Sequence, residues 1–317
     1  PWQSVGAKGV VTLSAKLMLA LLPPQTSFFK LQVDESMLGQ FAPEVKSELD
    51  LSFSKIERVI LDAVAASDDR VVVHQAIKHL VVAGNALLFM SKNGLKLYPL
   101  NRYVCERDGS GNVVEIVTKE LINKDILDEV FPGYKPTIPE SVSDSTVGVG
   151  EDVEVYTHIK RVDNKFNWHQ EIDGKIIPRT KGTSPMDTNP WIALRFNTVD
   201  GEAYGRGRVE EFLGDLKSLE ALSQAICEGS AAAAKVVFTV SPSSTTKPST
   251  LAAAGNGAIV QGRPDDIGVV QVGKTADFAT AFQMIQTLER RLSEAFLVLS
   301  VRQSERTTAE EVRMTQF

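Results

Sequence analysis

Residues 209–240 read VEEFLGDLKSLEALSQAICEGSAAAAKVVFTV, and residues 275–299 read TADFATAFQMIQTLERRLSEAFLVL. Each segment repeats its large apolar residues at the period of about 3.6 that indicates a helix with one apolar face. The first segment repeats Val209, Phe212, Leu213, Leu216, Leu219, Leu222 and Ile226, and the second repeats Phe278, Phe282, Ile285, Leu288, Leu292, Phe296 and Leu299. We therefore predict two helices of on the order of 25 residues, each roughly 35–40 Å long at ~1.5 Å per residue.

The stretch between these two helices is too small to be a domain. Residues 236–240, 258–261 and 268–272 have the composition of short strands. The polar segment 241–250, SPSSTTKPST, predicts an exposed loop at the tip. Three short strands would leave open edges, and two long helices with an apolar face need neighbours, so other copies of the same chain are candidate partners.

The first two thirds of the chain predicts an α+β body. Gly84-Asn85 is a helix C-cap pair, Asp108–Asn112 is a hairpin loop, and Asp173-Gly174 is a two-residue hairpin turn. Helices are expected at residues 3–22, 45–67 and 69–83, and strands at 28–34, 86–90, 95–97, 103–106, 113–118, 153–159, 166–172, 175–179 and 191–196. The fold class predicted for the whole chain is therefore α+β, with a helix–tip–helix arm at the end.

The composition excludes several classes of protein. The chain has 317 residues, of which 43% are hydrophobic and 23% charged, so it can bury the cores of two or three units. No apolar run reaches the roughly 18–20 residues of a membrane span, so no membrane partner is expected. Cys105 and Cys227 lack the spacing of a zinc site or a disulfide framework. The net charge of −6 without a basic face argues against a tight grip on nucleic acid, but it allows a surface past which DNA moves.

One motif match points to an enzyme. Gly268–Thr275, GVVQVGKT, fits the G-x-x-x-x-G-K-[ST] pattern of P-loop NTPases. That loop must curl so that its N–H groups converge on phosphate, whereas Val-Val-Gln-Val prefers an extended strand. The pattern also needs a metal-binding Asp after a later strand, and the residues after Thr275 predict helices. We favour a strand followed by a helix that Thr275 or Asp277 caps, and keep the NTPase as the enzyme alternative.

No other catalytic, metal or cofactor site is expected. The histidines at positions 74, 79, 158 and 169 lack metal-ligand spacing, and the sequence has no G-x-S-x-G elbow. Residues 204–208, YGRGR, could form an anion-binding nest, but a flexible lead-in to the long helix is favoured. Near the end, residues 300–307, SVRQSERT, predict either a simple helix–helix turn or a projecting loop. The start at Pro1 and a capping box at Thr308–Glu311 with only six residues after it suggest a segment of a longer protein.

Three stretches of the sequence resemble one known family. Residues 1–10 (PWQSVGAKGV) followed by LMLAL at 17–21, residues 209–235, and residues 305–313 (ERTTAEEVR) are similar to the portal, or head-to-tail connector, proteins of short-tailed bacteriophages, podoviruses of the autographivirus type. The resemblance covers essentially the whole chain. It implies the phage portal fold and a ring-forming homo-oligomer, a dodecamer.

The resemblance also implies a division of the chain. Residues 1–206 would form the wing, 207–235 the first stem helix, 236–274 the clip, 275–299 the second stem helix, and 300–317 the channel loop and the start of the next wing helix. The C-terminal part of the wing and the crown would be absent.

The implied function is a DNA conduit without enzyme activity or cofactor. Such a ring occupies the head–tail vertex of the virion capsid, is assembled in the host cytoplasm, and passes double-stranded DNA during packaging and ejection. Its implied partners are the terminase motor and then a tail adaptor protein at the clip, together with the major capsid and scaffolding proteins. Another ring-forming virion adaptor protein remains a second alternative.

Candidate site residues follow from this assignment. The first stem helix is acidic, and an acidic bore repels phosphate, which lets duplex DNA pass without sticking. The DNA channel candidates are Arg302, Gln303, Arg306, Glu220 and Glu228. The clip docking candidates are Ser243, Ser244, Thr245, Thr246 and Lys247.

Overall fold

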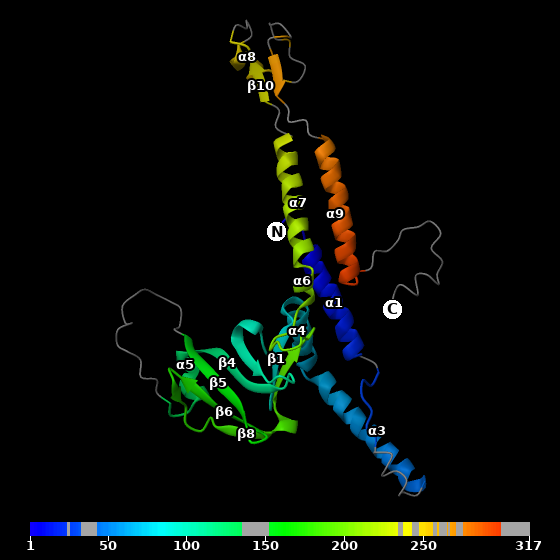
Figure 1. Ribbon diagram of the computed structural model, residues 1–317, viewed down its shortest axis with the longest axis vertical. Coiled ribbons are helices and arrows are strands. Elements are labelled where there is room, and N and C mark those ends of the chain that lie inside the picture. Colours follow the sequence, from blue (N-terminus) through cyan, green and yellow to red (C-terminus); the bar gives the residue numbers. More distant parts are fainter. Residues whose placement is uncertain are drawn as a thin grey trace. The chain divides into compact units, whose positions relative to one another are not determined.

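The computed structural model describes residues 1–23, 26–32, 43–134, 152–233, 237–242, 247–255, 259, 265, 267–270 and 275–298. The chain divides into two compact units. The body unit comprises Lys8–Phe212 together with Phe296–Val298, and the arm unit comprises Pro1–Ala7 together with Leu213–Ala295. The mixture of helices and antiparallel sheets confirms the predicted α+β class (Figure 1).

Three predicted helices of the body are confirmed. They are α1 (Val5–Leu21), α3 (Pro43–Ala66) and α4 (Asp69–Ala83). Helix α4 ends where the sequence predicts, because Gly84 adopts the left-handed conformation with φ 72° and donates its N–H to the Leu80 carbonyl. Gly9 of α1 lies against the Phe296 ring, where a Cβ atom would come within 2.7 Å of the ring.

The strand predicted at residues 28–34 is wrong within its described part. Phe28–Gln32 form no strand, and residues 33–34 lie outside the described residues. The Leu31 N–H donates instead to the carboxylate of Glu57 on α3, 2.5 Å away. A helix side chain therefore satisfies a backbone donor that a sheet partner would otherwise have taken.

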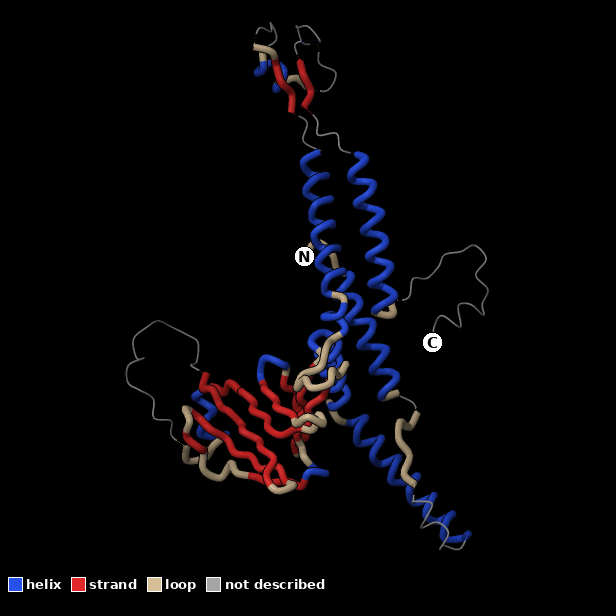
Figure 2. Tube along the Cα trace, in the orientation of Figure 1, coloured by secondary structure: helices blue, strands red, loops and turns tan. Residues whose placement is uncertain are grey.

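Two antiparallel sheets form the rest of the body (Figure 2). The smaller sheet has the order β2-β1-β9. In the larger sheet the order is β3-β4-β5-β6-β7, with β8 also paired to β6. The strands are β1 (Asn85–Ser91), β2 (Gly94–Tyr98), β3 (Tyr103–Arg107), β4 (Val113–Asn123), β5 (Asp152–Val162), β6 (Lys165–Ile172), β7 (Lys175–Ile176), β8 (Gly182–Pro185) and β9 (Trp191–Arg195). Two short 3-10 helices, η1 (Leu100–Arg102) and η3 (Met186–Thr188), connect strands.

One face of the larger sheet builds the main core. Ile116 of β4 pairs with Ile159 of β5, and both are fully buried. Because side chains alternate along a strand, Phe166 of β6 reaches the same core, where Leu87 and Trp191 of the smaller sheet meet it. A second cluster lies under the short helix α5 (Lys124–Val130).

Three features of the body were not predicted. Helix α5 has seven residues, which is too few to reveal a helical period, and β8 is a four-residue strand. The strand predicted at 175–179 ends at Ile176, because the chain turns at Ile177–Thr180. Both hairpin turns, at Asp108–Asn112 and at Asp173-Gly174, are confirmed.

The flexible lead-in predicted at residues 204–208 is also wrong. Asn85, which is buried, donates its side-chain amide to the Gly205 carbonyl and accepts from the Gly205 N–H at 2.8 and 2.7 Å. A Cβ atom on Gly207 would come within 2.4 Å of the Val82 carbonyl oxygen. These glycines therefore allow the backbone of residues 205–207 to pack closely against the end of α4. The segment is held in place by these contacts.

The arm unit contains the two long helices and the strands between them. Its elements are α7 (Leu213–Ala233), β10 (Val237–Val240), α8 (Pro248–Ala252), β11 (Ile267–Val270) and α9 (Thr275–Ala295). The helix predicted to begin at Val209 is interrupted: α6 (Arg208–Glu211) is a separate turn, because Phe212 leaves helical geometry at φ −104°, ψ 15°. Helix α8, residues 248–252, begins inside the predicted tip loop and ends two residues beyond it. Most of the strand predicted at 258–261 lies outside the described residues.

Candidate functional site

Helices α7 and α9 pack along their predicted apolar faces. Leu219 of α7 is fully buried, and Ile285, Leu288 and Leu292 of α9 are buried or nearly so. Gly229 brings the two helices close together, since a Cβ atom there would lie 2.6 Å from the Phe278 ring. The pair is therefore one packed element of the arm unit.

Polar contacts tie the outside of this pair together. Arg291 of α9 donates to both carboxylate oxygens of Asp215 on α7 at 3.0 Å, with its side chain half exposed. An exposed ion pair of this kind contributes about 1 kcal/mol or less. Buried apolar contact between α7 and α9, rather than the Arg291–Asp215 ion pair, therefore provides most of the stability of the helix pair.

Part of the predicted apolar faces stays exposed, because Leu213 and Phe282, which belong to them, are not covered by any described residue. Phe282 and Met284 of α9 are 55% and 58% exposed, and Leu213 of α7 is 43% exposed. A row of small exposed residues runs along α7: Gly214, Ser218, Ala221 and Ala225. These exposed apolar side chains and the small-residue surface are available for contact with another molecule.

The two acidic channel candidates lie on α7 in different surroundings. Glu220 accepts the Trp2 N–H at 2.7 Å, so it also holds the N-terminal segment of the arm unit. Glu228 is exposed and accepts from Gln224 at 2.8 Å, one turn earlier. Both carboxylates therefore project from a helix surface, as predicted for the first long helix.

Most of the other predicted site residues cannot be placed. Arg302, Gln303 and Arg306, and the docking candidates Ser243 to Thr246, lie outside the described residues. Lys247 is exposed immediately before α8, and its carbonyl accepts the Thr250 N–H at 3.1 Å. Among the described candidates, Glu220, Glu228 and Lys247, the structure shows no contact of one with another.

The structure argues against the nucleotide site at Gly268–Thr275. Gly268 pairs with Thr239 in the antiparallel ladder of β10 and β11, and Thr239 also donates its hydroxyl to the Gly268 carbonyl at 3.1 Å. Backbone in a ladder cannot also curl around a phosphate. Residues 271–274 lie outside the described residues, and α9 begins at Thr275 as predicted.

Cys105 is buried in the core of the larger sheet. Burial raises the pKa of the Cys105 thiol, which disfavours the nucleophilic thiolate. Within the described ranges, no three His, Cys, Asp or Glu residues lie close enough to hold a metal ion. None of the described helices is long and apolar enough to cross a membrane.

Comparisons with known proteins agree on one family. The family model described as bacteriophage head to tail connecting protein matches residues 1–316. The portal proteins of Escherichia phage T7 and Enterobacteria phage T3 are 38% and 39% identical to the chain over 99% of its length. That of Enterobacteria phage SP6 is 29% identical over 98%.

The chain spans about three fifths of the length of these relatives, namely 60%, 59% and 61%. Among solved structures, the neck of an empty gene transfer agent particle is similar with a TM-score of 0.40 and 12% identity, covering 78% of this chain and 60% of that one.

Proposed function

Because this chain belongs to the family of bacteriophage head-to-tail connecting proteins, we propose that it is a portal subunit, one copy of a ring through which double-stranded DNA passes. The observation that carries the proposal is the family match, which extends over residues 1–316. The identity to two portal proteins over 99% of the chain supports it. Both the body unit and the arm unit therefore fall within the matched region.

The surfaces of the arm unit support assembly into a ring. A head-to-tail ring needs two different surfaces on every copy, each fitting the other. One surface, on α9, presents the large exposed side chains of Phe282 and Met284. The other, on α7, presents only small side chains. Contact between copies would remove these apolar groups from water at roughly 25 cal/mol per Å².

The negative charge of the chain suits a channel through which DNA passes better than a site that binds DNA tightly. The net charge is −6, and Glu220 and Glu228 project from α7. Carboxylates that face DNA repel its phosphates, so the duplex can slide without a series of bound states. We assign no enzymatic step to the chain.

The finer assignments are proposals that rest on the family. The ring would be a dodecamer at the head–tail vertex of the virion and would be assembled in the host cytoplasm. Residues 1–206 would form the wing, residues 207–235 and 275–299 the stem helices, and residues 236–274 the clip. Residues 300–317 would form the channel loop and the start of the next wing helix. Lys247 and the neighbouring Ser243–Thr246 would dock terminase and then a tail adaptor protein. Capsid and scaffolding proteins would contact the wing.

Electron microscopy of the purified chain tests the proposal. We expect negatively stained particles to be rings with a central hole, and class averages to have twelvefold symmetry. Mass photometry measures the number of copies independently. Monomers at micromolar concentration would contradict ring formation, and closed rings of another symmetry would contradict the dodecamer while leaving the ring itself intact.

A further inference from the structure

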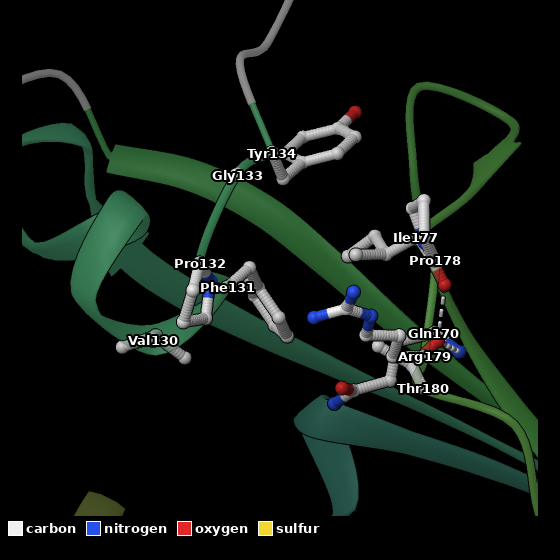
Figure 3. A pocket seen from close by; sticks show the side chains of 10 residues that line it. All are labelled: Val130, Phe131, Pro132, Gly133, Tyr134, Gln170, Ile177, Pro178, Arg179 and Thr180. Atoms are coloured by element: carbon white, nitrogen blue, oxygen red, sulfur yellow. Dashed lines mark hydrogen bonds between the residues drawn. The ribbon is translucent and has the colours of Figure 1, made fainter.

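A hollow of about 690 Å³ lies at one end of the larger sheet of the body (Figure 3). Three chain segments line it: residues 130–134, which begin at the last residue of α5, residues 177–180 after β7, and Gln170 of β6. Its volume is within the range of about 300–1,000 Å³ that is usual for ligand pockets. Nothing in the sequence indicated it, because its walls are two irregular turns.

Arg179 is the only cationic side chain among the described residues that line the hollow. Figure 3 shows its guanidinium group extending across the hollow toward Phe131. Two other arginines of the body have several acceptors: Arg107 donates to three backbone carbonyls, and Arg206 pairs with two carboxylates. For Arg179, no acceptor is present in the described part of the chain.

The backbone of Arg179 is strained. Its φ of +65° lies in the left-handed region, which few residues other than glycine adopt. The turn is fixed on both sides, since Thr180 donates its hydroxyl to the Ile177 carbonyl at 2.7 Å and accepts the Gln170 N–H at 3.0 Å. Strain held by such contacts is a feature of binding sites.

The remaining walls are mostly apolar. Phe131, Pro132, Ile177 and Pro178 line the hollow beside Arg179. Phe131 and Ile177 are buried, whereas Pro132, Pro178 and Arg179 itself are exposed. A planar guanidinium matches a carboxylate through two parallel hydrogen bonds. One cation among apolar walls is poorly suited to a nucleic acid backbone, which is bound by rows of Lys and Arg that neutralise successive phosphates.

We propose that this hollow binds an acidic segment of a partner protein, with one Asp or Glu carboxylate on Arg179 and apolar neighbours against Phe131 and Pro178. A guanidinium that has no acceptor among the described residues provides the charge that an acidic segment complements. The site lies wholly within the body unit and does not depend on ring formation, so either proposal can fail without the other.

Fluorescence anisotropy with peptides of about ten residues tests the site. One fluorescein-labelled pair has a central Leu-Glu-Leu or Leu-Gln-Leu, and a second pair has a central Leu-Asp-Leu or Leu-Asn-Leu. We expect each acidic peptide to bind the purified chain at least about tenfold more tightly than its amide twin, because a charge-assisted pair is lost in the twin. Equal binding within both pairs would overturn the proposal.

Arg179→Gly is the decisive variant, because it removes the guanidinium and also relieves the left-handed strain. We expect the preference for acidic peptides to disappear while the midpoint of thermal unfolding stays level or rises by about 2–4 °C. Lys175→Gln removes the same charge on the neighbouring strand and should keep the preference. A similar loss in Lys175→Gln, or Arg179-dependent binding of inorganic phosphate without any peptide preference, would contradict an acidic-segment site.

Discussion

At the scale of single residues, Glu115 is a carboxylate with two cationic neighbours. It lies on β4, where it pairs with the His158 imidazole, and with Lys160 at 3.2 Å, both from β5. The hydrogen bond from His158, followed by the one from Lys160, lowers the pKa of Glu115. A carboxyl group whose pKa is lowered by folding stabilises the fold above its unfolded pKa, and that stability is lost as the pH falls through the folded pKa.

Glu115→Gln should therefore lower the free energy of unfolding at pH 7 by about 1 kcal/mol or less, because the pair is partly exposed. The difference from the unchanged chain should be smaller at pH 3 than at pH 7, because the stability that a lowered folded pKa provides is lost as the pH falls through that pKa. Urea unfolding at both pH values measures this. Glu129→Gln, at an exposed position of α5, is the control and should change little. A deficit for Glu115→Gln that is as large at pH 3 as at pH 7 would show that packing, not charge, is responsible.

Residues 83–85 and 205–207 illustrate why a glycine-rich sequence can be misjudged. Glycine is common in flexible segments, and this predicted a loose lead-in. Here its role is the opposite, since the Asn85 side chain fixes Gly205 from both sides and Gly207 has no room for a Cβ atom. The contact partners lie about 120 residues away in the sequence, so no local pattern could have revealed them.

At the scale of elements, α9 combines a buried and an exposed set of apolar residues. Leu292 is fully buried, whereas Phe282 on the same helix is 55% exposed. The first should matter for folding and the second for contact between copies. The two positions can therefore be separated by mutation.

Leu292→Ala should lower the free energy of unfolding by about 2–5 kcal/mol, because it leaves a cavity in the packed face. Phe282→Asp should leave the midpoint of thermal unfolding of the monomer nearly unchanged but abolish rings, since it places a charge in an apolar contact. Gln283→Asp adds the same charge at an exposed polar position and is the matched control. Circular dichroism and mass photometry measure the two effects. Intact rings in Phe282→Asp would show that this residue is not at the interface.

The sequence predicted the elements that have a long period and missed those set by tertiary contacts. Helices α3, α4, α7 and α9 have 15 residues or more, enough to repeat an apolar face several times. The interruption at Phe212 and the turn at Arg179 have no comparable signal. Glu220 and Glu228 of the candidate channel could be placed on a helix from the sequence. The hollow at Arg179 could not be predicted, because it depends on two turns that meet in space.

At the scale of the whole molecule, we propose that the function is carried out by the assembled ring and not by any single copy of the chain. On the proposed function, we expect the channel to include a cationic contact that holds DNA when packaging pauses, because carboxylates alone repel its phosphates. Arg302 and Arg306, which lie outside the described residues, are the candidates that the sequence offers for this contact. Because a ring repeats each side chain in every copy, weak contacts multiply around the duplex.

Replacing both Arg302 and Arg306 by Ala should reduce the fraction of particles that retain a full genome. In purified rings the same change should flatten the dependence of DNA binding on salt, since each lost phosphate contact lowers the slope of log K against log salt by roughly 0.9. Arg58→Ala, at an exposed position of α3 in the body unit, removes a charge away from the proposed channel and should change neither quantity. Packaging and retention that are unaffected in the double variant would exclude the two arginines as the DNA contact. The hold on DNA would then have to come from other residues of the ring.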